Sequence, residues 1–280
     1  MNRHPLNPIG REDIAHFQED GAICLRRVFD AEWVARMNAA VDRLLANPGN
    51  RAREATKAGS PGRFHMNVFM WRWDPDFRAF ALESPLPEVA AALMGADRVS
   101  LFYDQAFVKE PGTKEVTQWH HDLPFWPALG GDIVSLWVAL TPVSVEGSGL
   151  EYIAGSHKWG TFYRAATPDE DPRFSDAKLE PCPDFSAMKG DPRYRFLSWS
   201  CEPGDVICHH PLTVHGAGGN PLGRRRAAIS VRYAGKDARW DPRPAVMRVE
   251  GAPETKLKAG DPLVLDGVFP IAWERESAHA

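Results

Sequence analysis

Residues 133–143 read Ile-Val-Ser-Leu-Trp-Val-Ala-Leu-Thr-Pro-Val, a run that predicts a strong buried strand. Val99 to Lys109 carries two alternating sets of side chains, both partly apolar, and predicts a strand that is buried in part on both faces. Shorter strands are predicted at residues 22–25, 150–153, 196–201, 206–208 and 226–233. Short strands separated by Gly and Pro turns, after helical flanks, predict a mainly β fold of the jelly-roll or sandwich type.

Helical patterns precede this β-rich region. They predict helices at residues 11–20 and 31–46, the second capped by Asp30, and two short helices within 76–94 because prolines interrupt that segment. We therefore expect a single domain over residues 1–280. It would have a helical preface at about 11–95, a β core at about 99–235 and a C-terminal extension at about 236–280.

Composition excludes several classes of protein. The 280 residues are 44% hydrophobic and 25% charged, as in ordinary soluble globular proteins, and a net charge of −4 gives no footprint for nucleic acid or an anionic membrane. No apolar run reaches about 18 residues, and the N-terminal residues lack the apolar core of a signal peptide. We expect a cytoplasmic protein without a membrane or nucleic-acid partner; no pattern specifies an oligomeric state.

Four cysteines are too few for a disulfide framework in a chain of this length. Cys201 and Cys208 could serve as zinc ligands, but their spacing matches no standard zinc site. Buried reduced thiols are the favoured interpretation.

A histidine and a carboxylate stand two residues apart in Gln118-Trp119-His120-His121-Asp122-Leu123-Pro124. In an extended chain residues i and i+2 face the same way, with Cα atoms about 6–7 Å apart. His120 and Asp122 could then share one metal ion, while His121 would face away.

A third ligand is expected downstream. His215 is followed by small residues that permit close approach of a co-substrate, and Arg226 opens a predicted strand eleven residues later. His120, Asp122 and His215 have the order of a 2-His-1-carboxylate triad, which leaves open metal positions and points to a non-haem Fe(II) oxygenase. The guanidinium of Arg226 suits a carboxylate. His157 is a weaker ligand candidate, and Arg224 and Arg225 read as solvated neighbours.

Two other functions use the same residues. A zinc hydrolase could have these three ligands, although it has no evident use for Arg226. A non-catalytic jelly-roll binding protein could retain the triad as a relic.

The chain resembles the phytanoyl-CoA dioxygenase family of Fe(II)- and 2-oxoglutarate-dependent oxygenases, which includes ectoine hydroxylases. The resemblance covers most of the chain and lies in these stretches: His16-Phe17 through Gly21, 104–112 (DQAFVKEPG), 119–126 (WHHDLPFW), 135–143 (SLWVALTPV), 147–159 (GSGLEYIAGSHKW), Pro203-Gly204-Asp205 and His215 to Ser230.

This resemblance implies a double-stranded β-helix, the cupin-like jelly roll. It implies Fe(II) on His120, Asp122 and His215, and the C5 carboxylate of 2-oxoglutarate on Arg226. It also implies Gln105 and Trp137 in the co-substrate pocket. With O2, such an enzyme would hydroxylate an unactivated C–H of a small organic substrate and release succinate and CO2.

The chain departs from the family pattern at two positions. Relatives often have serine two residues after the distal histidine, where this sequence has Ala217, and often glutamine at the position of His121. Because Asp122 is present, no position is vacated for a halide, so the resemblance favours hydroxylation over halogenation.

Two features near the motif admit two interpretations each. Phe125, Trp126, Trp159 and Tyr163 could line a substrate pocket or belong to the core. Residues 165–195, rich in Pro, Asp and Arg, could form a lid over the substrate or a passive insertion.

Overall fold

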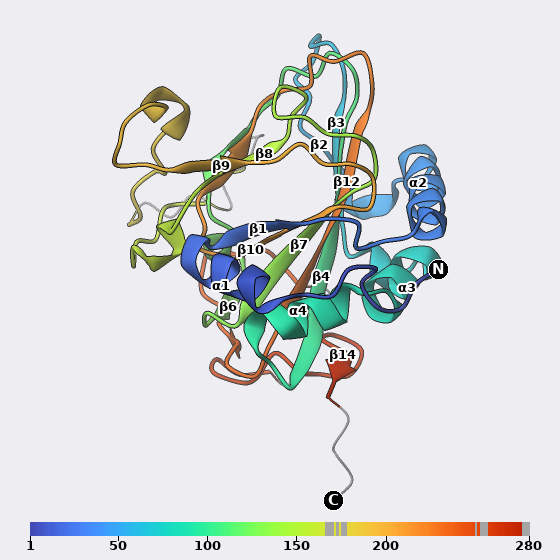
Figure 1. The fold of residues 1–280 in the computed structure, drawn as a ribbon, viewed down its shortest axis with the longest axis vertical. Helices are drawn as coiled ribbons and strands as arrows, with labels where there is room; N and C mark the ends of the chain where they lie inside the picture. Colours follow the sequence, from blue (N-terminus) through green and yellow to red (C-terminus); the bar gives the residue numbers. More distant parts are fainter. Residues whose placement is uncertain (166–170, 172–173, 175–177, 250, 253–256, 276–280) are drawn as a thin grey trace, which may run out of the picture.

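The computed structural model describes residues 1–165, 171, 174, 178–249, 251–252 and 257–275. The α-helices and three of the strands lie in the first 95 residues, and most strands follow them (Figure 1). The helices are α1 (Arg11–Asp20), α2 (Ala31–Ala46), α3 (Pro75–Glu83) and α4 (Leu86–Met94). The Asp30 side chain accepts the N–H of Trp33 and caps α2, as predicted.

Two antiparallel sheets make up most of the fold. The large sheet runs in the order β1-β10-β7-β12-β4-β3-β2, with β14 added beside β4, and the smaller one in the order β5-β11-β8-β9. The strands of the large sheet are β1 (Ala22–Leu25), β2 (Arg53–Glu54), β3 (Phe64–Val68), β4 (Arg98–Lys109), β7 (Ile133–Ala139), β10 (Val206–His209), β12 (Arg226–Ala234) and β14 (Ile271–Glu274). Those of the small sheet are β5 (Thr117–His120), β8 (Leu150–Ile153), β9 (Phe196–Ser198) and β11 (His215–Ala217), and β6 (Ala128–Leu129) pairs with β13 (Arg239–Trp240).

Packing divides the large sheet into two faces. Alternate residues of β7 and β12, such as Leu136 and Ile229, join the helices in one apolar cluster. The residues between them, such as Trp137 and Ala228, face the small sheet, where Tyr152 and Leu150 pack against them. The predicted mainly β fold with flanking helices is confirmed, and the segment at 11–95 also contributes β1, β2 and β3 to the large sheet.

The cysteines are free thiols, as expected. Cys208 lies in the helix-side cluster and Cys201 in the cluster between the sheets, so the two do not form a zinc site. The Cys24 and Cys201 sulfurs are 3.9 Å apart, near the carboxylate of Asp205. That carboxylate is already occupied by the Arg26 guanidinium at 2.7 Å.

Among the described residues, no helix has both the length and the apolar character needed to cross a bilayer.

Candidate metal centre and adjoining cavity

His120 and His215 lie opposite each other on β5 and β11, and their rings are 4.3 Å apart. The Nδ1 atom of His120 is 2.7 Å from the Gln118 carbonyl, and that of His215 is 2.9 Å from the Thr213 carbonyl. A carbonyl only accepts, so each Nδ1 carries the proton and each Nε2 keeps a lone pair for a metal.

Asp122 completes the cluster with a backbone conformation that the sequence pattern did not predict. The expectation of an extended chain from His120 to Asp122 was wrong: β5 ends at His120, and Asp122 has φ −72° and ψ −40° at the start of a 3₁₀ turn, Leu123–Phe125. Its Oδ1 nevertheless lies 3.5 Å from His120 Nε2 and 3.9 Å from His215 Nε2. The three donor atoms lie within 4.8 Å of one another, an arrangement that fits a single metal ion.

The cluster is electrostatically prepared for a cation. Burial alone would raise the pKa of Asp122, but hydrogen bonds from His120 and His209 and the charge of Arg232 hold it well below its ordinary value. Burial also lowers the pKa of His215 well below that of free histidine. An ionised carboxylate beside a neutral imidazole is the form in which both bind metal.

Side chains from the large sheet hold the other oxygen of Asp122. Ser135 Oγ donates to Oδ2 at 3.1 Å, and His209 Nε2 lies 3.3 Å from it. His209 Nδ1 is in turn 3.1 Å from the Tyr152 hydroxyl. The sequence pattern assigned no role to either residue; only the pairing of β7 with β10 reveals that both orient Asp122.

His121 faces away from the cluster, as predicted. Its Nε2 accepts the backbone N–H of Tyr163 at 2.8 Å, and its ring packs beside those of Phe162 and Tyr163. His157 also lies apart, with Nε2 3.2 Å from the carbonyl of Gln18.

Arg226 is buried, and one of its nitrogens has no partner in the described part of the chain. Its Nε donates to the Ser148 carbonyl at 3.1 Å, its Nη2 to the Ser148 hydroxyl at 3.2 Å, and the guanidinium lies over Trp137, 5.4 Å from the ring centre. Burial lowers the pKa of Arg226 to about 10. Nη1 is buried without an acceptor among the described residues, which fits a site for an anionic ligand. Ser148 lies in a stretch that carries the family resemblance, but the sequence pattern assigned it no role.

Arg225, by contrast, makes ion pairs with Asp42 at 2.6 Å and Glu110 at 2.8 Å near the surface, so it is a neighbour and not a ligand of the cavity.

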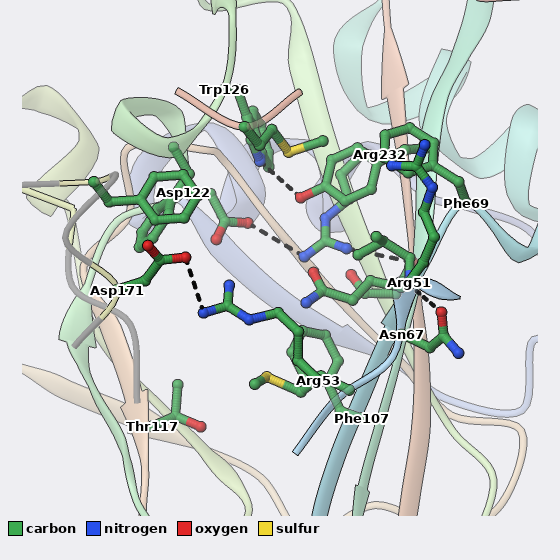
Figure 2. A pocket seen from close by; sticks show the side chains of 18 of the residues that line it. Arg51, Arg53, Asn67, Phe69, Phe107, Thr117, Asp122, Trp126, Asp171 and Arg232 are labelled. Atoms are coloured by element: carbon green, nitrogen blue, oxygen red, sulfur yellow. Dashed lines mark hydrogen bonds and ion pairs between the residues drawn. The ribbon is translucent and has the colours of Figure 1, made fainter. Parts of the chain in front are cut away.

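A cavity of about 1180 Å³ joins the metal cluster to Arg226. Gln105 and Trp137 line it, as does Phe125, whose ring lies 5.7 Å from that of His120. Trp126 also contributes to its wall but is otherwise buried, with Nε1 2.7 Å from the Tyr103 hydroxyl. Figure 2 shows the cavity from close by, with Asp122 beside the guanidinium of Arg232 on its wall.

The remaining aromatic candidates lie elsewhere. Trp159 is partly exposed and contacts Phe185 and Tyr194, and Tyr163 packs on His121. Ala217 packs in the core between the sheets, without a polar group to offer a co-substrate.

A cluster of metal-ligating residues and an anion site share one cavity, and this agrees with a comparison of the sequence against family models. The phytanoyl-CoA dioxygenase (PhyH) model matches residues 17–228. The chain belongs to the phytanoyl-CoA dioxygenase family. It is therefore a non-haem iron, 2-oxoglutarate-dependent dioxygenase, and the predicted enzyme class and cofactors are confirmed.

Curated relatives of this phytanoyl-CoA dioxygenase family member extend over most of the chain. It is 28% identical over 272 residues to an ectoine dioxygenase of Sphingopyxis alaskensis, covering 92% of this chain and 88% of the relative. It is 26% identical over 258 residues to the multifunctional dioxygenase prhA of Penicillium brasilianum, covering 85% and 77% respectively.

Among solved structures, the carbocyclase SnoK from nogalamycin biosynthesis, an α-ketoglutarate-dependent non-haem enzyme, superposes with a TM-score of 0.74 at 25% identity. The match covers 98% of this chain and 100% of that one. The predicted jelly roll is thereby confirmed.

Proposed function

We propose that His120, Asp122 and His215 bind the catalytic Fe(II) and that Arg226 binds the C5 carboxylate of 2-oxoglutarate, with Gln105 and Trp137 lining the co-substrate pocket. The observation that carries the proposal is that the residues of three convergent donor atoms and a buried arginine line one cavity, and that one nitrogen of this arginine has no acceptor among the described residues. Bound iron and 2-oxoglutarate together supply the oxidising chemistry with O2, and succinate and CO2 leave as co-products.

The chain's own residues orient these groups. The carbonyls of Gln118 and Thr213 fix the two imidazoles, while Ser135 and His209 hold Asp122 from the side away from its metal-facing oxygen. Ser148 and Trp137 keep the Arg226 guanidinium in place. Each ligand is thus positioned before the metal or co-substrate arrives.

We propose that the reaction on the main substrate is hydroxylation of an unactivated C–H of a small organic molecule. A facial triad fills three metal positions and leaves the others for co-substrate and O2. The carboxylate of Asp122 occupies the place that a halide would need.

For residues 165–195 both interpretations stay open, a lid over the substrate or a passive insertion. Residues 166–170, 172–173 and 175–177 lie outside the described part of the chain. In the described part, Phe185 packs on Trp119, the neighbour of His120, and Ser186 Oγ accepts the Trp119 indole N–H at 2.8 Å. Limited proteolysis with and without Fe(II) and 2-oxoglutarate tests the lid, since equal cleavage in both states contradicts it.

Residues 1–280 would form one catalytic domain, because β1 and β14, from opposite ends of the chain, belong to one sheet. We propose a cytoplasmic enzyme whose partners are small molecules, with no nucleic-acid or membrane partner.

The decisive experiment adds Fe(II) and then 2-oxoglutarate to the protein without oxygen. A chelate of the two gives a visible charge-transfer band, which we expect in the native protein. Arg226→Met should raise the 2-oxoglutarate concentration needed for half of the band by about thirtyfold or more, since a buried charge pair is lost. Arg225→Met is the matched control, because its guanidinium pairs at the surface and should leave the requirement unchanged. An unaltered requirement in Arg226→Met would remove this residue from the role.

Succinate release over a panel of acyl-CoA esters, amino-acid derivatives and natural products would then identify the substrate.

A further inference from the structure

A second buried arginine, Arg232, also lines the cavity. It lies on β12 six residues beyond Arg226, on the same face of the strand and about 20 Å further along at ~3.3 Å per residue. Its Nη2 lies 3.8 Å from Asp122 Oδ2, so Arg232 is at the metal end of the cavity.

The donors of Arg232 are poorly satisfied for a group that is 3% exposed. Nε is buried without an acceptor in the described part of the chain, and Nη1 reaches the Ser230 carbonyl only at 3.5 Å. The contact with Asp122 is longer than a hydrogen bond. A buried guanidinium in this state has a large desolvation cost that a further acceptor would offset.

Aromatic rings fix the guanidinium in place. It lies 4.6 Å from the ring centre of Tyr103 and 5.9 Å from those of Phe107 and Trp126. Arg232 therefore lines the cavity with a guanidinium in a defined orientation, as an anion-binding group requires.

The co-substrate cannot serve both arginines. A five-carbon diacid that chelates the metal and reaches Arg226 extends away from Arg232, so Arg232 is left for a different ligand. The charged groups on the rest of the cavity wall are mainly positive. Apart from the groups assigned to metal and co-substrate, they are Arg51, Arg53, Arg232 and Arg248, with Asp171, which pairs with Arg53 at 3.3 Å.

We propose that the main substrate of this enzyme is an organic carboxylate, and that Arg232 binds its carboxylate beside the metal. The proposal rests on the proposed function for the seating of 2-oxoglutarate on Arg226. A cavity of about 1180 Å³ exceeds the size of most small-molecule sites and accommodates such a substrate in addition to the co-substrate. The rings of Phe69 and Phe125 on its wall suit an apolar or aromatic body attached to the carboxylate.

The test uses two matched pairs of probes: benzoate with benzamide, and 3-phenylpropionate with 3-phenylpropionamide. Each is titrated calorimetrically, without oxygen, into the full-length protein loaded with Fe(II) and 2-oxoglutarate, and the charge-transfer band is recorded in parallel. We expect at least one carboxylate to bind about tenfold or more tightly than its amide. Arg232→Met should abolish this preference, and its band, recorded in parallel, shows whether iron and 2-oxoglutarate still bind. Arg225→Met, the surface control, should keep both.

Equal binding of acid and amide in both pairs, or an undiminished preference in Arg232→Met, would overturn the proposal. If Arg232→Met loses the band, the comparison passes to Arg232→Lys, which keeps the charge but lacks the planar fork. A reduced preference for the carboxylate in Arg232→Lys supports the proposal, because the planar guanidinium is lost, and a full preference overturns the proposal. If the native protein itself forms no band, the proposed function fails, while calorimetry on the Fe(II)-loaded protein still tests Arg232 separately.

Discussion

The two faces of β12 are equally buried, yet they differ in chemistry. Toward the helices the strand presents Ala227, Ile229, Val231 and Tyr233, and the Tyr233 hydroxyl is satisfied by the carbonyl of Ala81 at 2.7 Å. Toward the cavity it presents Arg226, Ala228, Ser230 and Arg232. Each of the three polar residues in this second set has a buried atom without a partner among the described residues.

One face of this strand therefore serves packing, and the other face serves binding. Satisfied polar groups in an apolar cluster stabilise the fold, whereas unsatisfied buried groups beside a cavity cost stability and are retained for ligands. Substitutions on the helix side should therefore change the free energy of unfolding, and those around the cavity should change binding.

The largest effect is expected at the metal cluster. Asp122→Ala removes one of three ligands, and we expect succinate formation to fall by about a thousandfold or more, since the metal is no longer held in place. Succinate release and Fe(II) titration measure the two effects. Ser135→Ala, which removes one support of Asp122, should lose about tenfold in metal affinity. Full activity in Asp122→Ala would contradict the cavity-side assignment.

On the helix side, Ile229→Ala should lower the free energy of unfolding by about 2–5 kcal/mol, because a fully buried side chain leaves a cavity behind. Denaturant unfolding measures this change. Ser230→Ala, one residue along on the other face, is the matched control and should change unfolding little, since its hydroxyl has no partner among the residues that the structure describes. Similar losses of unfolding free energy in both variants would contradict the proposed difference between the two faces.

Asp104 is a buried acid on β4, the strand that pairs with β12. Its Oδ2 accepts the N–H of Trp71 at 3.0 Å, and burial raises its pKa to about 8. The folded protein then holds this proton more tightly than the unfolded chain does, so the contribution of Asp104 to stability is complete below about pH 4 and is lost as the pH rises through about 8.

Asp104→Asn should therefore flatten the decline of stability between about pH 4 and 8, a slope of at most about 1.4 kcal/mol per pH unit for one proton. Unfolding curves at several pH values measure it. An identical slope in the native protein and the variant would show that Asp104 titrates normally.

The smallest effect is expected at Ser148. Ser148→Ala removes one hydrogen bond to Arg226 and keeps the carbonyl that accepts the other. The 2-oxoglutarate requirement should rise about two- to tenfold, as expected for one such bond. Titration of the charge-transfer band measures it, with Ser144→Ala, in the same turn, as control. A rise as large as that in Arg226→Met would mean that Ser148 contacts the co-substrate directly.

Local sequence patterns were sufficient to predict the helices, most strands and the three residues of the candidate metal site. Alternation in β7 and β12 predicted the strands, Asp30 and the prolines near residue 85 predicted helix boundaries, and residue type with spacing selected His120, Asp122 and His215. These features depend on neighbours in the chain, which a sequence pattern records directly.

The tertiary structure decided what surrounds them. Several features arise where distant segments meet across two sheets: the turn at Asp122, the supports from Ser135 and His209, the contact of Ser148 with Arg226 and the burial of Arg232. No local periodicity encodes such contacts, because they depend on strand order and register. The sequence alone therefore determined the chemistry at the metal, and only the folded chain placed a second buried arginine beside it.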